Sequence, residues 1–129
     1  MTIKAIHDIA IIAGNYELSK RFYTELLGFT IIREVYRAER DSYKLDLAVN
    51  GLYQIELFSF RDCKPRASFP EANGLRHLAF AVDNVAEWID YLRANNVDTQ
   101  DIRIDETKGK QFTFFNDPDG QPLELYEVF

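Results

Sequence analysis

Two histidines and two glutamates in this sequence are of residue types that can bind a metal ion or carry a proton. His7 and His77 are the only histidines, and each falls in a segment expected to form a strand. Glu56 and Glu124 each interrupt a run of otherwise apolar, strand-like residues. A carboxylate buried in such a run costs several kcal/mol unless something pairs with it. Taken singly, either histidine is also explained as a core residue, and either glutamate as the solvent side of its strand.

The spacing of these four residues indicates an internal duplication. The histidines are 70 residues apart and the glutamates are 68 residues apart. In each half of the chain, the histidine lies in the first expected strand and the glutamate in the last. A repeat of this length with matching chemistry favours a shared role for the four residues.

Each half is expected to fold in the order β-α-β-β-β. Short β-branched and aromatic runs predict strands at residues 6–12, 29–36, 45–49 and 53–58, and again at 75–82, 97–104, 111–115 and 122–128. Apolar residues at helical spacing predict a helix over residues 16–27 and another from residue 85 to Asn95. Residues 60–74 contain two prolines and no periodicity, so they are expected to link module 5–59 to module 75–129.

Turn residues mark the ends of several of these elements. Gly28 stands where a helix would close in the left-handed conformation. Asn50 and Gly51 predict a tight hairpin. Proline and glycine within residues 116–120 predict a turn before the last strand.

The four residues together have the chemistry of a transition-metal site. Alternation along the last strand puts Glu124 on the face opposite Leu123 and Leu125, which a helix can cover. If the two sheets curl towards each other, two imidazole nitrogens and two carboxylate oxygens converge. This donor set suits a divalent first-row ion, because imidazole favours zinc, nickel or iron over calcium and magnesium. Such an ion would also be the missing partner of both carboxylates.

Composition excludes several classes of protein. The 129 residues, 47% of them hydrophobic, are enough for one domain with a sizeable core. A net charge of −6 argues against a general nucleic-acid binder. No apolar run is long enough for a membrane span, and the first residues lack a signal-peptide pattern. Cys63 is the only cysteine, so no internal disulfide can form. We therefore expect a cytoplasmic protein.

The sequence resembles the vicinal oxygen chelate superfamily, which includes glyoxalase I, fosfomycin- and bleomycin-resistance proteins and extradiol dioxygenases. The resemblance covers essentially the whole chain and rests on four segments, at residues 6–10, 22–29, 76–83 and 116–127. It implies an α+β fold in a single domain of residues 1–129. In that fold, two tandem βαβββ modules form curved mixed sheets around a metal cleft.

The set His7, Glu56, His77 and Glu124 is similar to the metal ligands of bacterial glyoxalase I. This resemblance implies one divalent ion per site (nickel, zinc, manganese, cobalt or iron) and a small-molecule substrate, a hemithioacetal or related α-hydroxycarbonyl. The ion would stabilise an enediolate, and a glutamate would shuttle the proton. The family gives the larger share of that role to the position of Glu124, with Glu56 as its counterpart.

A second class stays open, that of a superfamily member that binds or inactivates an antibiotic by sequestration or by thiol transfer. The substrate is in either case a small molecule, which includes thiol adducts. Five basic residues can contact an anionic substrate, although a solvated surface explains them as well: Arg37, Arg40, Lys44, Arg76 and Lys110.

Open sheet edges in each module predict a homodimer. The sequence leaves open whether the two halves of the site come from one chain or from two. It also leaves open which glutamate is the main base.

Overall fold

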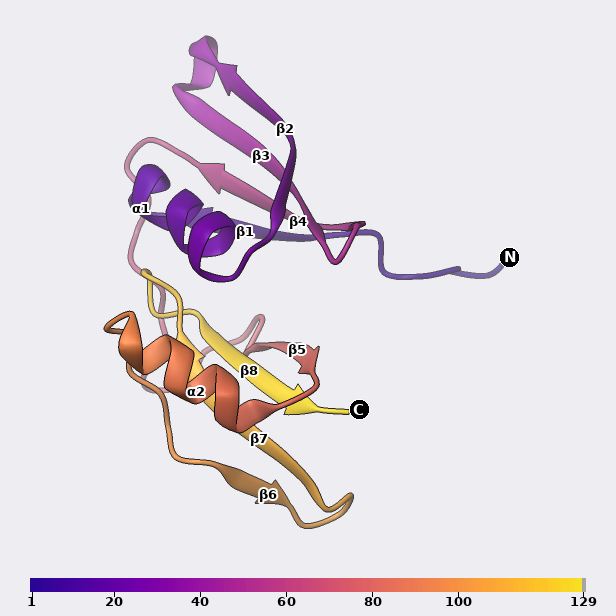
Figure 1. Ribbon diagram of the computed structural model, residues 1–129. Helices are drawn as coiled ribbons and strands as arrows, with labels where there is room; N and C mark the ends of the chain where they lie inside the picture. The colour runs from indigo at the N-terminus through magenta and orange to yellow at the C-terminus, as the bar shows by residue number, and fades with distance from the viewer. Residues whose placement is uncertain (129) are drawn as a thin grey trace. The chain divides into compact units, whose positions relative to one another are not determined.

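The computed structural model describes residues 1–128, which form two compact units, Met1–Pro65 and Arg66–Phe129, each described here by itself (Figure 1). The first unit contains, in order, β1 (Ile9–Ala13), α1 (Tyr16–Arg21), η1 (Phe22–Leu26), β2 (Thr30–Arg37), η2 (Ala38–Arg40), β3 (Ser42–Val49) and β4 (Leu52–Ser59). The second unit contains β5 (Leu78–Val82), α2 (Val85–Ala94), β6 (Arg103–Asp105), β7 (Lys110–Asn116) and β8 (Pro122–Glu127).

Each unit is built on one four-stranded mixed sheet. The strand order is β1-β4-β3-β2 in the first unit and β5-β8-β7-β6 in the second. In both sheets the first strand pairs in parallel with the last, and the other neighbours are antiparallel. Neither sheet closes on itself. The two βαβββ modules therefore confirm the fold class predicted from the sequence.

The core of the first unit lies on one face of its sheet. Alternate residues of the two central strands are almost fully buried there: Leu45, Leu47, Ile55 and Leu57. Tyr23, from η1, is also completely buried. The helical segment begins where the Asn15 side chain accepts a hydrogen bond from the Leu18 N–H at 3.1 Å.

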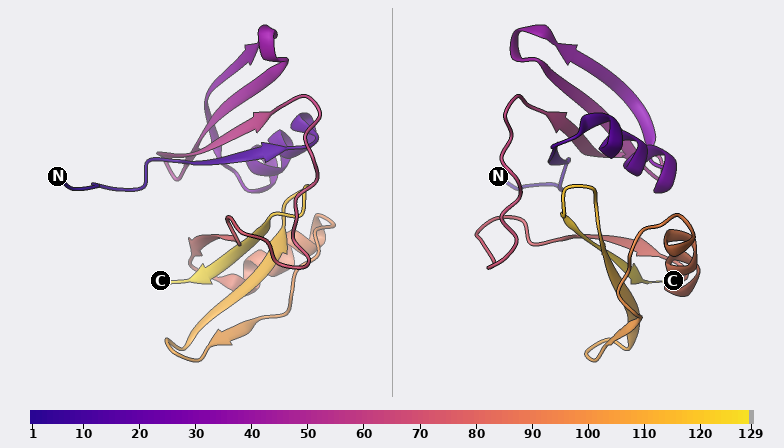
Figure 2. Two further views of the ribbon diagram at one scale, coloured as in Figure 1. Left: turned by 180° about the vertical axis from the view of Figure 1, so that it is seen from behind. Right: turned by 90° about the vertical axis from the view of Figure 1, so that its left-hand side faces the viewer.

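The core of the second unit lies between its sheet and α2. Figures 1 and 2 show α2 running across one face of the sheet. It buries Val85, Ile89 and Leu92 on that side, and Leu123 and Leu125 of β8 are buried likewise. The Asn84 side chain caps the helix by accepting from the Glu87 N–H at 3.1 Å. The alternation predicted for the last strand is therefore confirmed.

The predicted turns are confirmed. Gly28 has a φ of 77°, and Asn50 and Gly51 have φ values of 48° and 82°. Two successive positive values are those of a type I′ hairpin, which only residues such as asparagine and glycine adopt readily. Gly120 has a φ of 80° and closes the turn before β8.

The strand expected at residues 97–104 is wrong for most of its length. Only β6 is a strand, apart from one isolated bridge from Thr99 to Phe115. Side chains occupy the backbone acceptors that a ladder would use. The Thr113 hydroxyl donates to the Gln100 carbonyl at 2.8 Å, and Arg93 donates to the Thr99 carbonyl at 3.3 Å. The predicted helix 16–27 is likewise not uniform, because its second half is the π-helical η1.

Among residues 1–128, no helix has the length and apolar character needed to cross a membrane.

Candidate metal centre

The two glutamates occupy equivalent places in the two sheets. Glu56 of β4 pairs with Ala10 of β1, and Glu124 of β8 pairs with Ala79 of β5. The strand neighbours of each glutamate are buried in the core, so both carboxylates project from the opposite face of their sheet. Each side chain is 14% exposed. These carboxylates are therefore largely shielded but reachable from one side.

In the second unit, a histidine lies beside the glutamate. His77 comes directly before β5 and two residues before Ala79, so alternation puts its side chain on the face of Glu124. His77 Nε2 is 3.8 Å from Glu124 Oε2. That separation is too long for a hydrogen bond. Two ligands about 2.1 Å from a common ion lie at most about 4.2 Å apart. The pair therefore fits two ligands of one metal ion.

In the first unit, His7 is placed differently from what the sequence suggested. It precedes β1 by two residues, and its side chain is 81% exposed. Its ring lies 5.4 Å from that of Tyr53, and its Nδ1 is hydrogen-bonded to Asp8. His7 as a metal ligand stays a prediction.

Asp8 is a candidate that the sequence analysis missed. It lies two residues before Ala10, as His77 lies two residues before Ala79. The pKa of Asp8 is lowered, chiefly by its hydrogen bond with His7, and further by a hydrogen bond with Glu56 and by the charge of Lys44. Superposing the strand patterns Asp-Ile-Ala-Ile (8–11) and His-Leu-Ala-Phe (77–80) would have found it.

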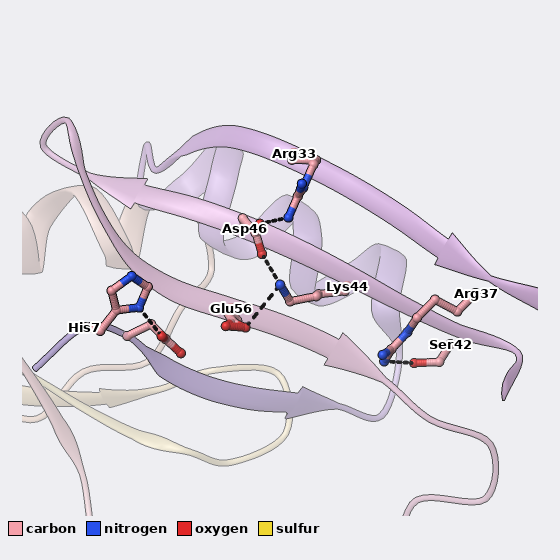
Figure 3. A network of polar contacts seen from close by, with 8 residues as sticks. His7, Arg33, Arg37, Ser42, Lys44, Asp46 and Glu56 are labelled. Carbon is pink, nitrogen blue, oxygen red and sulfur yellow. Dashed lines mark hydrogen bonds and ion pairs between the residues drawn. The ribbon is translucent and has the colours of Figure 1, made fainter.

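A lysine separates two carboxylates on the same face of the first sheet. Lys44 Nζ lies 3.6 Å from Glu56 Oε2 and 3.3 Å from Asp46 Oδ1 (Figure 3). Arg33 approaches Asp46 from the adjacent strand at 3.5 Å. Of the five basic residues considered from the sequence, Lys44 is the one in contact with a predicted ligand. The carboxylates of this unit are thus partly neutralised by cations of the protein itself.

The corresponding face of the second sheet is aromatic. Phe112, Phe114 and Tyr126 lie close to Glu124, and the His77 ring meets Phe114 edge-on with 5.1 Å between the ring centroids. Arg103 lies over the rings of Phe112 and Phe114, at 4.8 Å and 5.5 Å from their centroids. Glu124 therefore has aromatic side chains and an arginine near it, whereas Glu56 is paired directly with a lysine.

A pocket of about 320 Å³ opens beside Glu124. Its lining combines apolar and acidic side chains: Ile104, Asp105, Glu106, Phe112, Glu124 and Tyr126. The Tyr126 hydroxyl donates to Asp105 at 2.8 Å, which fixes one wall. A substrate group of moderate size can therefore reach the carboxylate.

Arg66 holds the segments that carry His77 and Glu124. It donates to the Leu75 carbonyl at 2.6 Å and to the Gln121 side chain at 2.8 Å. The first contact lies two residues before His77 and the second three residues before Glu124. Arg66 lies within residues 60–74, which the sequence predicts to be a linker. A lone arginine in a proline-containing loop carries no signal of this role.

Within the described residues, no three or more histidine, cysteine, aspartate and glutamate side chains come together as a ready metal site. Each unit instead supplies a pair. The donor types nevertheless fit a divalent ion, because imidazole and carboxylate are ligands for zinc and related metals, and 3.8 Å suits two ligands of one ion.

Comparison with known proteins shows the family to which the chain belongs. The family model of the Glyoxalase/Bleomycin resistance protein/Dioxygenase superfamily matches residues 5–125. The chain belongs to this superfamily, as its resemblance to the vicinal oxygen chelate proteins implied.

Among its relatives, the uncharacterized protein YaeR of Escherichia coli is 58% identical over 125 residues, which are 97% of either chain. The lactoylglutathione lyase of Salmonella typhimurium is 32% identical over 89% of this chain and 86% of that one. The metallothiol transferase FosB of Staphylococcus haemolyticus is 28% identical over 96% of this chain and 84% of that one. The crystal structure of a glyoxalase family protein from Enterococcus faecalis aligns with a TM-score of 0.89 at 47% identity, over 98% of this chain and 100% of that one.

Proposed function

We propose that the protein is a metal-dependent lyase or isomerase of the glyoxalase I type. The observation that carries this proposal is the His77–Glu124 pair, 3.8 Å apart on the open face of a parallel strand pair. Glu56 occupies the equivalent place in the other module. The 32% identity to a lactoylglutathione lyase over most of both chains supports the same class.

The proposed ligands are His77, Glu124, Glu56 and one side chain of the neighbouring pair His7 and Asp8. The candidate ions are nickel, zinc, manganese, cobalt and iron. Bound by these residues, such an ion would supply Lewis-acid chemistry to an α-hydroxycarbonyl substrate. The residues of the chain bind, orient and move protons around it.

Glu124 is the proposed base, and Glu56 its counterpart. Glu56 forms an ion pair with Lys44 at 3.6 Å, which engages its carboxylate. Glu124 has the imidazole of His77 3.8 Å away, and Phe114 lies opposite it on the neighbouring strand. We assign the proton transfer to Glu124 because its carboxylate borders the pocket in which a substrate carbon can lie. Glu124 takes the proton from one carbon and returns it to the next, while the hydroxyl proton passes to the former carbonyl oxygen.

The proposed substrate is a hemithioacetal or a related α-hydroxycarbonyl. The pocket beside Glu124 would hold its carbon portion against Phe112 and Tyr126. We also propose that the protein is a homodimer. β2 is an edge strand whose Ile31, Ile32, Val35 and Tyr36 are all exposed, and pairing of two chains would cover such residues.

The test is turnover of hemithioacetals by the metal-stripped protein after addition of each candidate ion. Hemithioacetals of methylglyoxal with several thiols, glutathione first, would be followed by absorbance and by NMR. We expect turnover that disappears with EDTA and returns with one or two of the ions. A protein that binds none of the ions would contradict the proposal.

The second candidate function is thiol transfer to a small molecule such as an antibiotic. The 28% identity to a metallothiol transferase over 96% of this chain favours it over simple sequestration. It predicts consumption of the thiol together with an epoxide substrate. The same metal-loaded protein, given fosfomycin and thiol, separates the two functions.

A further inference from the structure

We propose that Asp8, and not His7, is the metal ligand of the first module, so that the donor set is one imidazole and three carboxylates. This inference rests on the proposed function. It concerns which residue of an adjacent pair faces the ion, and hence which ions the site prefers.

Strand register carries the assignment. Ala10 pairs with Glu56 as Ala79 pairs with Glu124, and both pairings are parallel. Counting two residues back along each first strand gives Asp8 in one module and His77 in the other. Side chains two residues apart in an extended segment share a face. The register therefore puts Asp8 on the face of Glu56.

Contacts and exposure agree with the register. The Asp8 side chain is 24% exposed, whereas that of His7 is 81% exposed. Asp8 interacts electrostatically with Glu56 and is hydrogen-bonded to His7, whose ring lies beside Tyr53. Two carboxylates this close repel each other unless a proton or a cation lies between them or beside them. His7 is hydrogen-bonded to Asp8, and it would orient the Asp8 ligand through this bond.

The exchange of an imidazole for a carboxylate changes the preference among metals. Carboxylate oxygens suit manganese, whereas imidazole nitrogens suit nickel and zinc. Three carboxylates on one divalent ion would leave a net negative charge. Lys44, 3.6 Å from Glu56, is placed to offset it. The site should therefore discriminate less strongly in favour of nickel than a site with two imidazoles.

The test is manganese binding by the full-length protein, followed by the loss of the EPR signal of free Mn²⁺. Asp8→Ala should weaken Mn²⁺ binding at least a hundredfold, and the neighbouring His7→Ala by no more than tenfold. Asp8→His should raise the ratio of Ni²⁺ to Mn²⁺ affinity at least tenfold, as measured by competition. Circular dichroism of each variant checks the fold.

The results separate this inference from the proposed function. If the wild-type protein binds Mn²⁺ but His7→Ala loses as much affinity as Asp8→Ala, or more, the assignment of Asp8 is overturned while the metal-dependent function stands. An unchanged Ni²⁺ to Mn²⁺ ratio in a folded Asp8→His variant overturns it as well. If the wild-type protein binds no divalent ion, both proposals fail.

Discussion

Asp46 and Phe114 occupy the same position in the two modules. Asp46 lies directly across an antiparallel strand pair from Glu56, and Phe114 lies across the equivalent pair from Glu124. The duplication has therefore kept the two glutamates and changed their neighbours. Glu56 faces an aspartate across the strand pair and is paired with Lys44, whereas Glu124 faces an aromatic ring. This asymmetry is the reason to expect different roles for Glu56 and Glu124.

Removal of the proposed base should abolish most turnover without unfolding the protein. In the hemithioacetal assay, we expect Glu124→Gln to lower kcat by about 10²–10⁴-fold, the usual contribution of a general base. Glu87→Gln, an exposed glutamate in the first turn of α2, is the control and should keep its rate. Unchanged turnover in Glu124→Gln would exclude Glu124 as the base.

The aromatic wall of the pocket should affect substrate binding more than chemistry. Phe112→Ala removes part of the lining beside Glu124 and the ring under Arg103. Losing such a contact costs about 1–2 kcal/mol, so KM should rise about tenfold for substrates with a bulky apolar group. We expect kcat to change by less than about threefold. A fall in kcat with constant KM would place Phe112 nearer to the reacting carbons.

Arg66 should act as a positioning residue. Arg66→Ala removes the hydrogen bonds to the Leu75 carbonyl and to Gln121, which precede the two proposed ligands of the second unit. We expect about tenfold weaker metal binding, in the range found for outer-shell partners. Arg61→Ala, an exposed arginine outside these contacts, is the matched control. Equal metal affinity in the two variants would remove Arg66 from this role.

The ion pair of the first helix should make stability depend on pH. The pKa of Glu34 is lowered by hydrogen bonds from Lys20 and Tyr16, and that of Lys20 is raised, chiefly by its hydrogen bond to Glu34. A carboxyl with a depressed folded pKa stabilises the protein above its unfolded pKa, and the gain is lost as pH falls through the folded value.

Glu34→Gln should therefore cost about 0.5–1 kcal/mol of unfolding free energy at pH 7, because the pair is partly exposed. The difference from wild type should shrink as the pH falls below the ordinary glutamate pKa, and it should vanish once the pH lies below the lowered pKa of Glu34 in the folded state. Urea titrations at pH 7, 5 and 3 measure it, with Glu39→Gln as an exposed control. A cost that does not shrink between pH 7 and pH 3 would point to lost packing instead.

The single domain of residues 1–129 predicted from the sequence can be tested by unfolding. Leu57→Ala opens a cavity in the core of the first unit and should cost about 2–5 kcal/mol. Trp88, the only tryptophan, reports on α2 in the second unit. If the chain unfolds as one domain, Leu57→Ala shifts the Trp88 fluorescence transition and the circular dichroism transition equally. An unshifted fluorescence transition would show that the two units unfold separately.

The sequence predicts most of the fold because its local signals agree with one another. The type I′ turn at Asn50-Gly51, the cap at Asn84 and the alternation around Glu124 each depend on neighbouring residues alone. The failure at residues 97–104 has a different origin. Arg93 and Thr113 bind the carbonyls of that segment from elsewhere in the chain, and such side-chain contacts leave no periodic signal.

In the first module, the strand register determines which of two adjacent residues lies at the candidate site. The sequence pattern favours a strand from residue 6 and gives weight to His7, the rarer residue type. β1 begins at Ile9, and its pairing with β4 fixes which side chains share the face of Glu56. A shift of one residue exchanges the two faces of a strand. Only the pairing of two distant strands could place Asp8 there.

The parallel pairing of β5 with β8 also ties the site to the order of folding. His77 and Glu124 are far apart in the sequence, and β8 follows β5, β6 and β7 along the chain. The pair cannot form until that strand inserts between β5 and β7, a non-local step that follows the hairpin contacts. Metal binding by the second module would then serve as a reporter of completed folding, and a nascent chain would stay unable to capture the ion until then.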